Sequence, residues 1–328
     1  MGIKSGNERE YTMLDRRQFL VGAGAALVGG AAGCADTCNA RSIAPVKMRS
    51  NDPQSALVLW YGQTGHTQRL GRLLAKTFET EGLQTTAAPL RDFDLSTAAN
   101  FDLVVIGVPV HYMDVPPNVV DRLTTLPSLS RVPVAAWVTY GNKGSNPINT
   151  GWNLVELLTA KGGVPVGMSA FSNMNTFAPS LTGSGAKRTL RFKHLPDTET
   201  YERCRQFARD LLEHVRANQV TAIDHECDFS GMLTAFKPMW WMKKLTGEHH
   251  VDHDVCIKCG TCAATCPVGA IDPAELLIDR ERCILCCGCI NNCPAEAVRM
   301  TFMGGTVIGW PTFCRDHHIS IAEPPELG

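Results

Sequence analysis

The sequence predicts an α/β domain built on a parallel sheet, followed by a small, cysteine-rich domain. Its 328 residues are enough for about two domains, and a hydrophobic content of 44% is enough for buried cores. Between residues 55 and 218, short apolar runs alternate with helical patterns. Nine of the 14 cysteines lie between Cys256 and Cys293, too densely and too regularly for scattered disulfides, which indicates a metal-binding domain.

Residues 1–34 have the pattern of an export signal. Arg16 and Arg17 precede an apolar run over residues 19–33, which is shorter than the roughly 20 residues that a membrane span needs. The paired arginines resemble the twin-arginine signal, and the start of the protein is either Met1 or Met13. Twin-arginine export carries folded proteins, so we expect a protein on the periplasmic or outer side of the cytoplasmic membrane.

The signal ends in a sequence that resembles a lipoprotein processing site. Ala31 and Gly33 lead to Cys34, which the resemblance implies is lipidated and tethers the protein to the membrane. Simple cleavage without lipidation is the alternative. A linker over residues 35–54 then leads to the first folded domain.

Continuous apolar runs separated by helical patterns indicate a parallel sheet buried on both faces. Strands are expected at 55–61, 85–90, 102–109, 132–139 and 164–171, and helices at 67–78, 119–126, 152–160 and 200–217. Residues 171–197 form a long connection rich in Ser, Thr, Pro and Gly. The α/β domain therefore spans residues 55–218.

An open α/β sheet binds its ligand at the carboxyl ends of its strands, so the loops at 62–67, 109–117 and 139–151 are the candidates. The first of them joins a strand to a helix, where backbone N–H groups and the hydroxyls of Thr64 and Thr67 converge into a phosphate cradle. It lacks the lysine of a nucleoside triphosphate site, which favours a phosphomonoester.

This loop resembles the phosphate loop of flavodoxins, which bind FMN, although Gly62 stands where Ser or Thr is usual and His66 where Asn is usual. The resemblance implies FMN binding by Gly62, Gln63, Thr64, Gly65, His66, Thr67, Pro109, Val110, His111, Tyr112, Thr139, Tyr140, Gly141 and Asn142. Tyr112 and Tyr140 either stack on the flavin ring or cap the sheet edge. An ordinary turn, or a flavodoxin-like scaffold without cofactor, is the alternative.

A cysteine motif near the C-terminus occurs twice, 27 residues apart. Each copy has the form C-x₂-C-x₂-C-x₃-C-P, in which three thiolates hold one [4Fe-4S] cluster and the fourth turns to the other cluster. The first cluster is predicted on Cys256, Cys259, Cys262 and Cys293, and the second on Cys283, Cys286, Cys289 and Cys266. Zinc does not explain the duplication.

The duplicated motif resembles the bacterial two-cluster ferredoxin, which implies a small α+β domain at residues 250–302 between a linker at 219–249 and a tail at 303–328.

Several residues lie outside the predicted ligand sets. Cys287 is an additional cysteine of the second motif, and we expect either a free thiol near the second cluster or an alternative ligand. Cys204, Cys227 and Cys314 are expected to be buried thiols. Five histidines are expected either to be solvated or to form a third metal site: His249, His250, His253, His317 and His318. Residues 231–245, including Trp240 and Trp241, are expected between the domains or on a membrane surface.

The combined pattern predicts electron transfer. No nicotinamide fingerprint and no catalytic set is recognisable, and a net charge of -1 without basic runs argues against nucleic acid. Iron–sulfur clusters pass single electrons between each other and FMN or a redox partner. The order of domains resembles the EFR-type flavodoxin/ferredoxin fusion, which implies a carrier serving a redox protein or a membrane redox complex. An FMN-dependent reductase of a small substrate and a flavin-free docking module are the alternatives.

Overall fold

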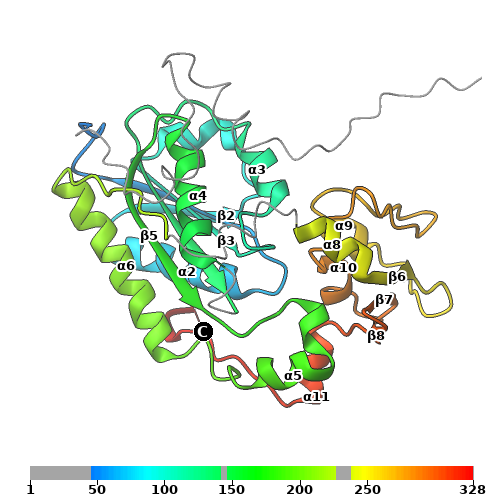
Figure 1. Cartoon of the computed structure of the whole chain (residues 1–328). Helices are drawn as coiled ribbons and strands as arrows, with labels where there is room; N and C mark the ends of the chain where they lie inside the picture. Colours follow the sequence, from blue (N-terminus) through cyan, green and yellow to red (C-terminus); the bar gives the residue numbers. More distant parts are fainter. Residues whose placement is uncertain (1–45, 142–145, 227–237, 328) are drawn as a thin grey trace, which may run out of the picture.

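The computed structural model describes residues 46–141, 146–226 and 238–327. Figure 1 shows a larger domain around a central sheet and, to one side of it, a smaller domain of short elements. The predicted signal peptide, the lipidation site at Cys34, Asn142 and Cys227 lie outside the described residues. Within the described part of the chain, no helix combines the length and apolarity needed to cross a membrane.

The larger domain is built on a five-stranded parallel sheet in the order β2-β1-β3-β4-β5. This is the flavodoxin-like order of a doubly wound sheet, which confirms the predicted fold. The strands are β1 (Ser55–Trp60), β2 (Gln84–Pro89), β3 (Leu103–Pro109), β4 (Pro133–Tyr140) and β5 (Val164–Ser172). Strand order reverses between β1 and β3, which places the ligand crevice at the carboxyl ends of these two strands.

Helices cover both faces of the sheet, so its central strands are apolar on both sides. Alternate residues along β1 enter opposite cores, since Val58 packs with helices α2 and α6 whereas Leu57 packs with α3 and α4. The helices are α2 (His66–Thr80), α3 (Pro117–Leu123), α4 (Pro147–Thr159) and α6 (Thr198–Arg216), with the short η1 (Leu95–Asn100) before β3.

The smaller domain is an α+β unit around a three-stranded antiparallel sheet, as predicted. Its strands are β6 (Thr246–Val251), β7 (Val298–Phe302) and β8 (Gly305–Thr306), and its short helices are α8 (Pro238–Leu245), α9 (Thr261–Thr265) and α10 (Gly288–Asn291). Helix α8 and strand β6 begin inside the segment predicted as a linker. The sequence did not indicate β6, because so short a strand is not recognisable without its partner β7. On α8, Trp240 and Trp241 are exposed rather than buried between the domains.

The segment predicted as a tail is ordered against both domains. It contains α11 (Trp310–Asp316) and η5 (Pro325–Leu327), and Phe313 is completely buried. Further along, Glu323 pairs with Arg69 of α2 at 2.7 Å and Glu326 pairs with Arg205 of α6 at 2.8 Å. The predicted long connection is also more structured than expected, since η3 (Ala178–Leu181) and α5 (Gly183–Leu190) lie within it and pack against α11.

Gly107 in β3 is required by its neighbour, because a Cβ atom there would overlap the ring of Trp137 in β4. We expect Gly107→Ala to lower the free energy of unfolding of the larger domain by about 1–3 kcal/mol through overpacking. Urea unfolding followed by tryptophan fluorescence measures this. Gly305→Ala is the control, since the nearest atom to its Cβ is 3.5 Å away, and equal stability of the two variants would contradict the assignment.

Candidate cofactor sites

The smaller domain contains two cavities, each walled by four of the predicted cysteines. Cys256, Cys259, Cys262 and Cys293 line the first cavity, and Cys266, Cys283, Cys286 and Cys289 line the second. The structure therefore brings together the two predicted ligand sets, each with one cysteine from the other copy of the motif. Among the described residues, no three His, Cys, Asp or Glu side chains meet as a site for a single metal ion.

The two cavities are related position by position through the 27-residue shift of the duplicated sequence. Most corresponding lining residues share their character, as Ala297 and Ala270 do. Two pairs differ in chemistry: Gly260 of the first cavity corresponds to Cys287 of the second, and Leu276 of the first corresponds to His249 of the second. Cys287 thus stands where the first motif has a glycine, and both residues have a left-handed backbone (φ 57° at Cys287 and 71° at Gly260). Cys287 therefore does not correspond to any of the predicted ligand positions of the first motif.

Backbone N–H groups donate to cysteine sulfurs in both copies at matching positions. Lys258 and Leu285 donate to the cysteines two residues before them, at 3.4 and 3.3 Å. Ala270 and Ala297 donate to Cys266 and Cys293, both at 3.2 Å. Donors aimed at sulfur stabilise the thiolate form that a cluster requires, so the residues present fit a cluster in each cavity.

The two cysteine cavities differ in their surroundings. Cys259 of the first set is exposed, whereas in the second set Cys289 is buried and Cys266, Cys283 and Cys286 are half-buried. The second copy of the motif lies against the larger domain: His111 Nε2 is 3.0 Å from the carbonyl oxygen of Ile284, and the Tyr112 hydroxyl donates to that of Leu285 at 3.3 Å. The second cavity is consequently the one that faces the parallel sheet.

A third cavity, of about 360 Å³, lies at the carboxyl edge of the parallel sheet. This volume falls within the usual range for small-molecule sites. The predicted FMN residues that line it are Gly62, Gln63, Thr64, His66, Thr67, Pro109, Val110, His111, Tyr112, Thr139, Tyr140 and Gly141. Gly65 lies on the far side of its loop, where it lines a separate cavity of about 620 Å³ together with Arg91 and Arg122.

The first loop keeps the features of a phosphate cradle. Gly65 adopts a left-handed conformation (φ 86°) immediately before α2, and the backbone N–H groups of Thr64, Gly65 and His66 make no hydrogen bond to another described residue. Around them, the Thr64 hydroxyl lies 2.9 Å from that of Thr176, and the Thr67 hydroxyl 2.8 Å from that of Thr139. Free N–H donors at a helix start beside four hydroxyls suit a phosphate group.

The two departures from the flavodoxin pattern have local explanations. A Cβ atom on Gly62 would lie 3.1 Å from the Thr67 hydroxyl, so the glycine leaves that hydroxyl room. His66 is buried and packs edge-on against Trp310, with ring centroids 5.5 Å apart. Burial, and secondarily the charge of Arg69, lower the pKa of His66 to about 3, which leaves the imidazole neutral. His66 therefore adds no positive charge to the phosphate cradle.

Sequence analysis missed part of the wall of the third cavity, which we call the FMN cavity because the sequence predicts FMN there. Residues 173–177, which follow β5, line it, and Phe177 packs edge-on against Tyr112 with ring centroids 5.8 Å apart. These residues follow the carboxyl end of a strand, so the rule that selected the other three loops would have found them. Tyr112 lines the cavity and also binds the smaller domain through its hydroxyl.

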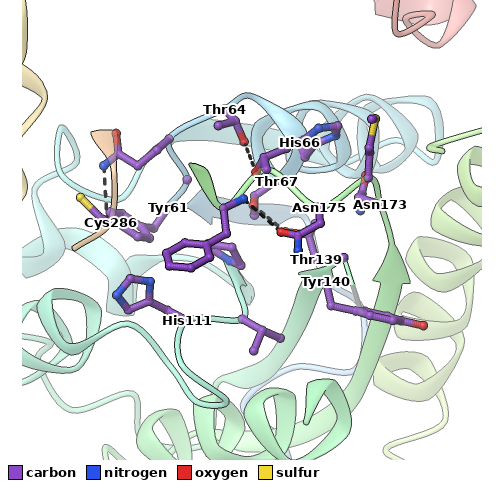
Figure 2. Close-up of a pocket in the computed structure, with 18 of the residues that line it drawn as sticks. Tyr61, Thr64, His66, Thr67, His111, Thr139, Tyr140, Asn173, Asn175 and Cys286 are labelled. Carbon is purple, nitrogen blue, oxygen red and sulfur yellow. Dashed lines mark hydrogen bonds between the residues drawn. The ribbon is translucent and has the colours of Figure 1, made fainter. Parts of the chain in front are cut away.

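Cys286 belongs to the walls of both the FMN cavity and the second cysteine cavity. Figure 2 shows it beside Tyr61, on the side of the FMN cavity away from Tyr140. Tyr61 is buried, and its hydroxyl accepts a hydrogen bond from Gln63 Nε2 at 3.4 Å. A single cysteine thus separates the two sites.

A family model described as "4Fe-4S binding domain" matches residues 249–272. The matched residues contain the first copy of the cysteine motif. A stretch of 26 residues is 62% identical to a ferredoxin of Megasphaera elsdenii, which is 8% of this chain and 48% of that protein, so the chain spans about half the length of this relative.

The other domain is similar to solved flavodoxins. A flavodoxin from Archaea is 15% identical with a TM-score of 0.36, covering 49% of this chain and 99% of its own. Flavodoxin 1 of Bacillus cereus is 14% identical with a TM-score of 0.37, covering 49% of this chain and 98% of its own. The flavodoxin-like assignment rests on the strand order itself.

The ligand sets can be tested by comparing two adjacent cysteines. We expect Cys286→Ser to lose the second cluster, because its sulfur lines the second cavity with the three other predicted ligands, and Cys287→Ser to keep both. Two [4Fe-4S] clusters correspond to about eight iron atoms per chain, so Cys286→Ser should retain about four. Iron analysis of anaerobically purified protein measures this. A Cys287→Ser variant that loses half of its iron would show that the extra cysteine is a ligand.

Proposed function

We propose that this protein is an electron carrier that passes single electrons between two [4Fe-4S] clusters and an FMN. The proposal rests on the position of Cys286, which is a predicted cluster ligand and also lines the FMN cavity. A flavin exchanges one or two electrons, whereas a cluster exchanges one at a time. Joined through one residue, the two sites form a continuous electron path within a single chain.

The residues of the larger domain would bind FMN by its two ends. The free N–H groups and hydroxyls of the Thr64–Thr67 loop would hold the phosphate, because they supply donors without a bulky cation. Tyr61, His111 and Phe177 would form the walls for the ring. Burial lowers the pKa of His111 to about 4, so its neutral imidazole presents no charge to the flavin.

In the smaller domain, the exposed first cluster site is the point of exchange with a partner. Cys259 is at the surface, and Ile257 near it is 65% exposed, whereas none of the four cysteines of the second set is exposed. Electron transfer slows steeply with distance, so a redox protein would dock next to the first cluster. The second cluster would then relay the electron to the FMN.

The position in the cell follows from the N-terminal sequence. We propose that the protein is exported by the twin-arginine pathway and tethered through a lipid on Cys34, which would place it beside a membrane redox complex. Mass spectrometry of the N-terminal peptide distinguishes a lipidated Cys34 from simple cleavage. The presence of residues 1–12 in the cellular precursor distinguishes Met1 from Met13 as the start.

Reductive titration tests the complete cofactor content. Each cluster accepts one electron and FMN accepts two, so the anaerobic protein should take up about four electrons per chain. Uptake of about two, with no flavin released on heating, would establish the flavin-free docking module instead. Turnover of a small organic acceptor in the absence of any redox protein would establish the reductase.

The phosphate cradle can be tested by removing one hydroxyl. We expect Thr67→Val to weaken FMN binding about tenfold, because one hydrogen bond to a charged group is lost. Fluorescence quenching during FMN titration of the flavin-depleted protein measures the affinity. Thr77→Val is the control, since that hydroxyl lies further along α2 and donates to the Leu73 carbonyl at 2.9 Å. Equal affinities would place the phosphate elsewhere.

A further inference from the structure

His249 is a buried histidine that faces the second cysteine cavity. It lies in β6, paired with Met300 of β7, and only 9% of it is exposed. Its Nε2 atom is 3.6 Å from the Sγ atom of Cys289. A cluster-bound cysteine is a thiolate, which can only accept a hydrogen bond, so Nε2 carries the hydrogen in the loaded protein.

The rest of the imidazole makes no competing polar contact. Nδ1 of His249 has no hydrogen-bond partner among the described residues. The neighbouring histidine, His250, is on the opposite face of the strand and exposed. A buried ring with its one polar contact directed at a ligand sulfur is placed to act on that sulfur.

The duplicated motif provides an internal comparison. The position that corresponds to His249 in the other cavity is Leu276, which is buried and has no group that can donate a hydrogen bond. The two sites therefore have equivalent cysteines and equivalent backbone N–H donors to sulfur, but their side-chain donors differ. His249 faces Cys289 in the second site, whereas the Thr261 hydroxyl lies 3.3 Å from Cys259 Sγ in the first.

We propose that His249 is a positioning residue that sets the reduction potential of the second cluster, through an N–H···S hydrogen bond from Nε2 to Cys289. The proposal rests on the clusters of the proposed function and not on the flavin. The electron added on reduction increases the negative charge on the ligand sulfurs, so a donor stabilises the reduced cluster more than the oxidised one. The potential of the second cluster is consequently higher than it would be with an aliphatic residue.

This effect acts at the cluster next to the FMN cavity. Cys289 and Cys286 belong to the same ligand set, and Cys286 forms the wall towards the flavin. A higher reduction potential at the second cluster shifts the equilibrium so that the electron resides there, next to the flavin, rather than on the exposed first cluster. The histidine therefore favours the inner end of the electron path.

The test compares three variants of the full-length, anaerobically purified protein. His249→Phe keeps a ring of similar size and removes the donor, His249→Gln keeps an amide donor, and His250→Phe is the matched control on the other face of β6. The potentials of both clusters are measured by dye-mediated titration followed by electron paramagnetic resonance. Iron content is measured first, so that absence of the clusters, which would refute the proposed function, is distinguished from an unchanged potential.

We expect His249→Phe to disfavour reduction of one cluster about tenfold, equivalent to about 59 mV for a one-electron couple, and to leave the other cluster unchanged. His249→Gln should recover part of this shift, and His250→Phe should have no effect. Unchanged potentials in a fully loaded His249→Phe protein would overturn the proposal, as would an equal shift in His250→Phe.

A second measurement does not depend on any variant being stable. In reduced wild-type protein with ¹⁵N-labelled histidine, pulsed electron paramagnetic resonance should detect coupling between one cluster and a histidine nitrogen, transmitted through the hydrogen bond. Absence of that coupling in protein with both clusters reduced would overturn the proposal, even if His249→Phe fails to assemble its second cluster.

Discussion

The arrangement of sites depends on the contact between the second cysteine motif and the carboxyl edge of the parallel sheet. Backbone carbonyls of the motif bind His111 and Tyr112 from the loop after β3. Gly288 allows the close approach on the other side, because a Cβ atom there would be 2.5 Å from the Gln63 side chain. The same loops that form the FMN cavity therefore hold a cluster ligand in its wall.

The C-terminal segment reinforces this contact from outside. Trp310 donates its backbone N–H to the Asn291 side chain at 2.8 Å, while its ring packs on His66 at the start of α2. Past α11, the carboxylates of Glu323 and Glu326 bind arginines on the back of the larger domain. Exposed ion pairs of this kind contribute little individually, so the buried Trp310 and Phe313 supply most of the attachment.

Sequence patterns were informative where the constraint is local. Continuous apolar runs located β1, β3, β4 and β5, and the alternation of strand and helix patterns located β2. Cysteine spacing predicted the two sets of four sulfurs that line the two cysteine cavities, because ligand geometry is encoded in short intervals. The wall formed by residues 173–177, the ordered C-terminal segment and the His249 contact were not foreseen. The C-terminal segment and the His249 contact depend on elements distant in sequence, as when β6 pairs with β7 and places His249 beside Cys289. Residues 173–177 are different, because they directly follow β5 and the strand-end rule would have found them.

Duplication followed by unequal surroundings explains how one motif can serve two roles. The two copies retain the same cysteine spacing and the same backbone donors to sulfur, which suits the same type of cluster in both. They differ in what faces them: solvent at Cys259, and Tyr61 with the FMN cavity at Cys286. Cluster potential responds to hydrogen bonds and to solvent, so docking one copy against a flavodoxin-like domain is itself sufficient to make the pair unequal. The two cysteine sites are therefore unequal because of their surroundings, which include the domain contact and His249, rather than because of the cysteine motif.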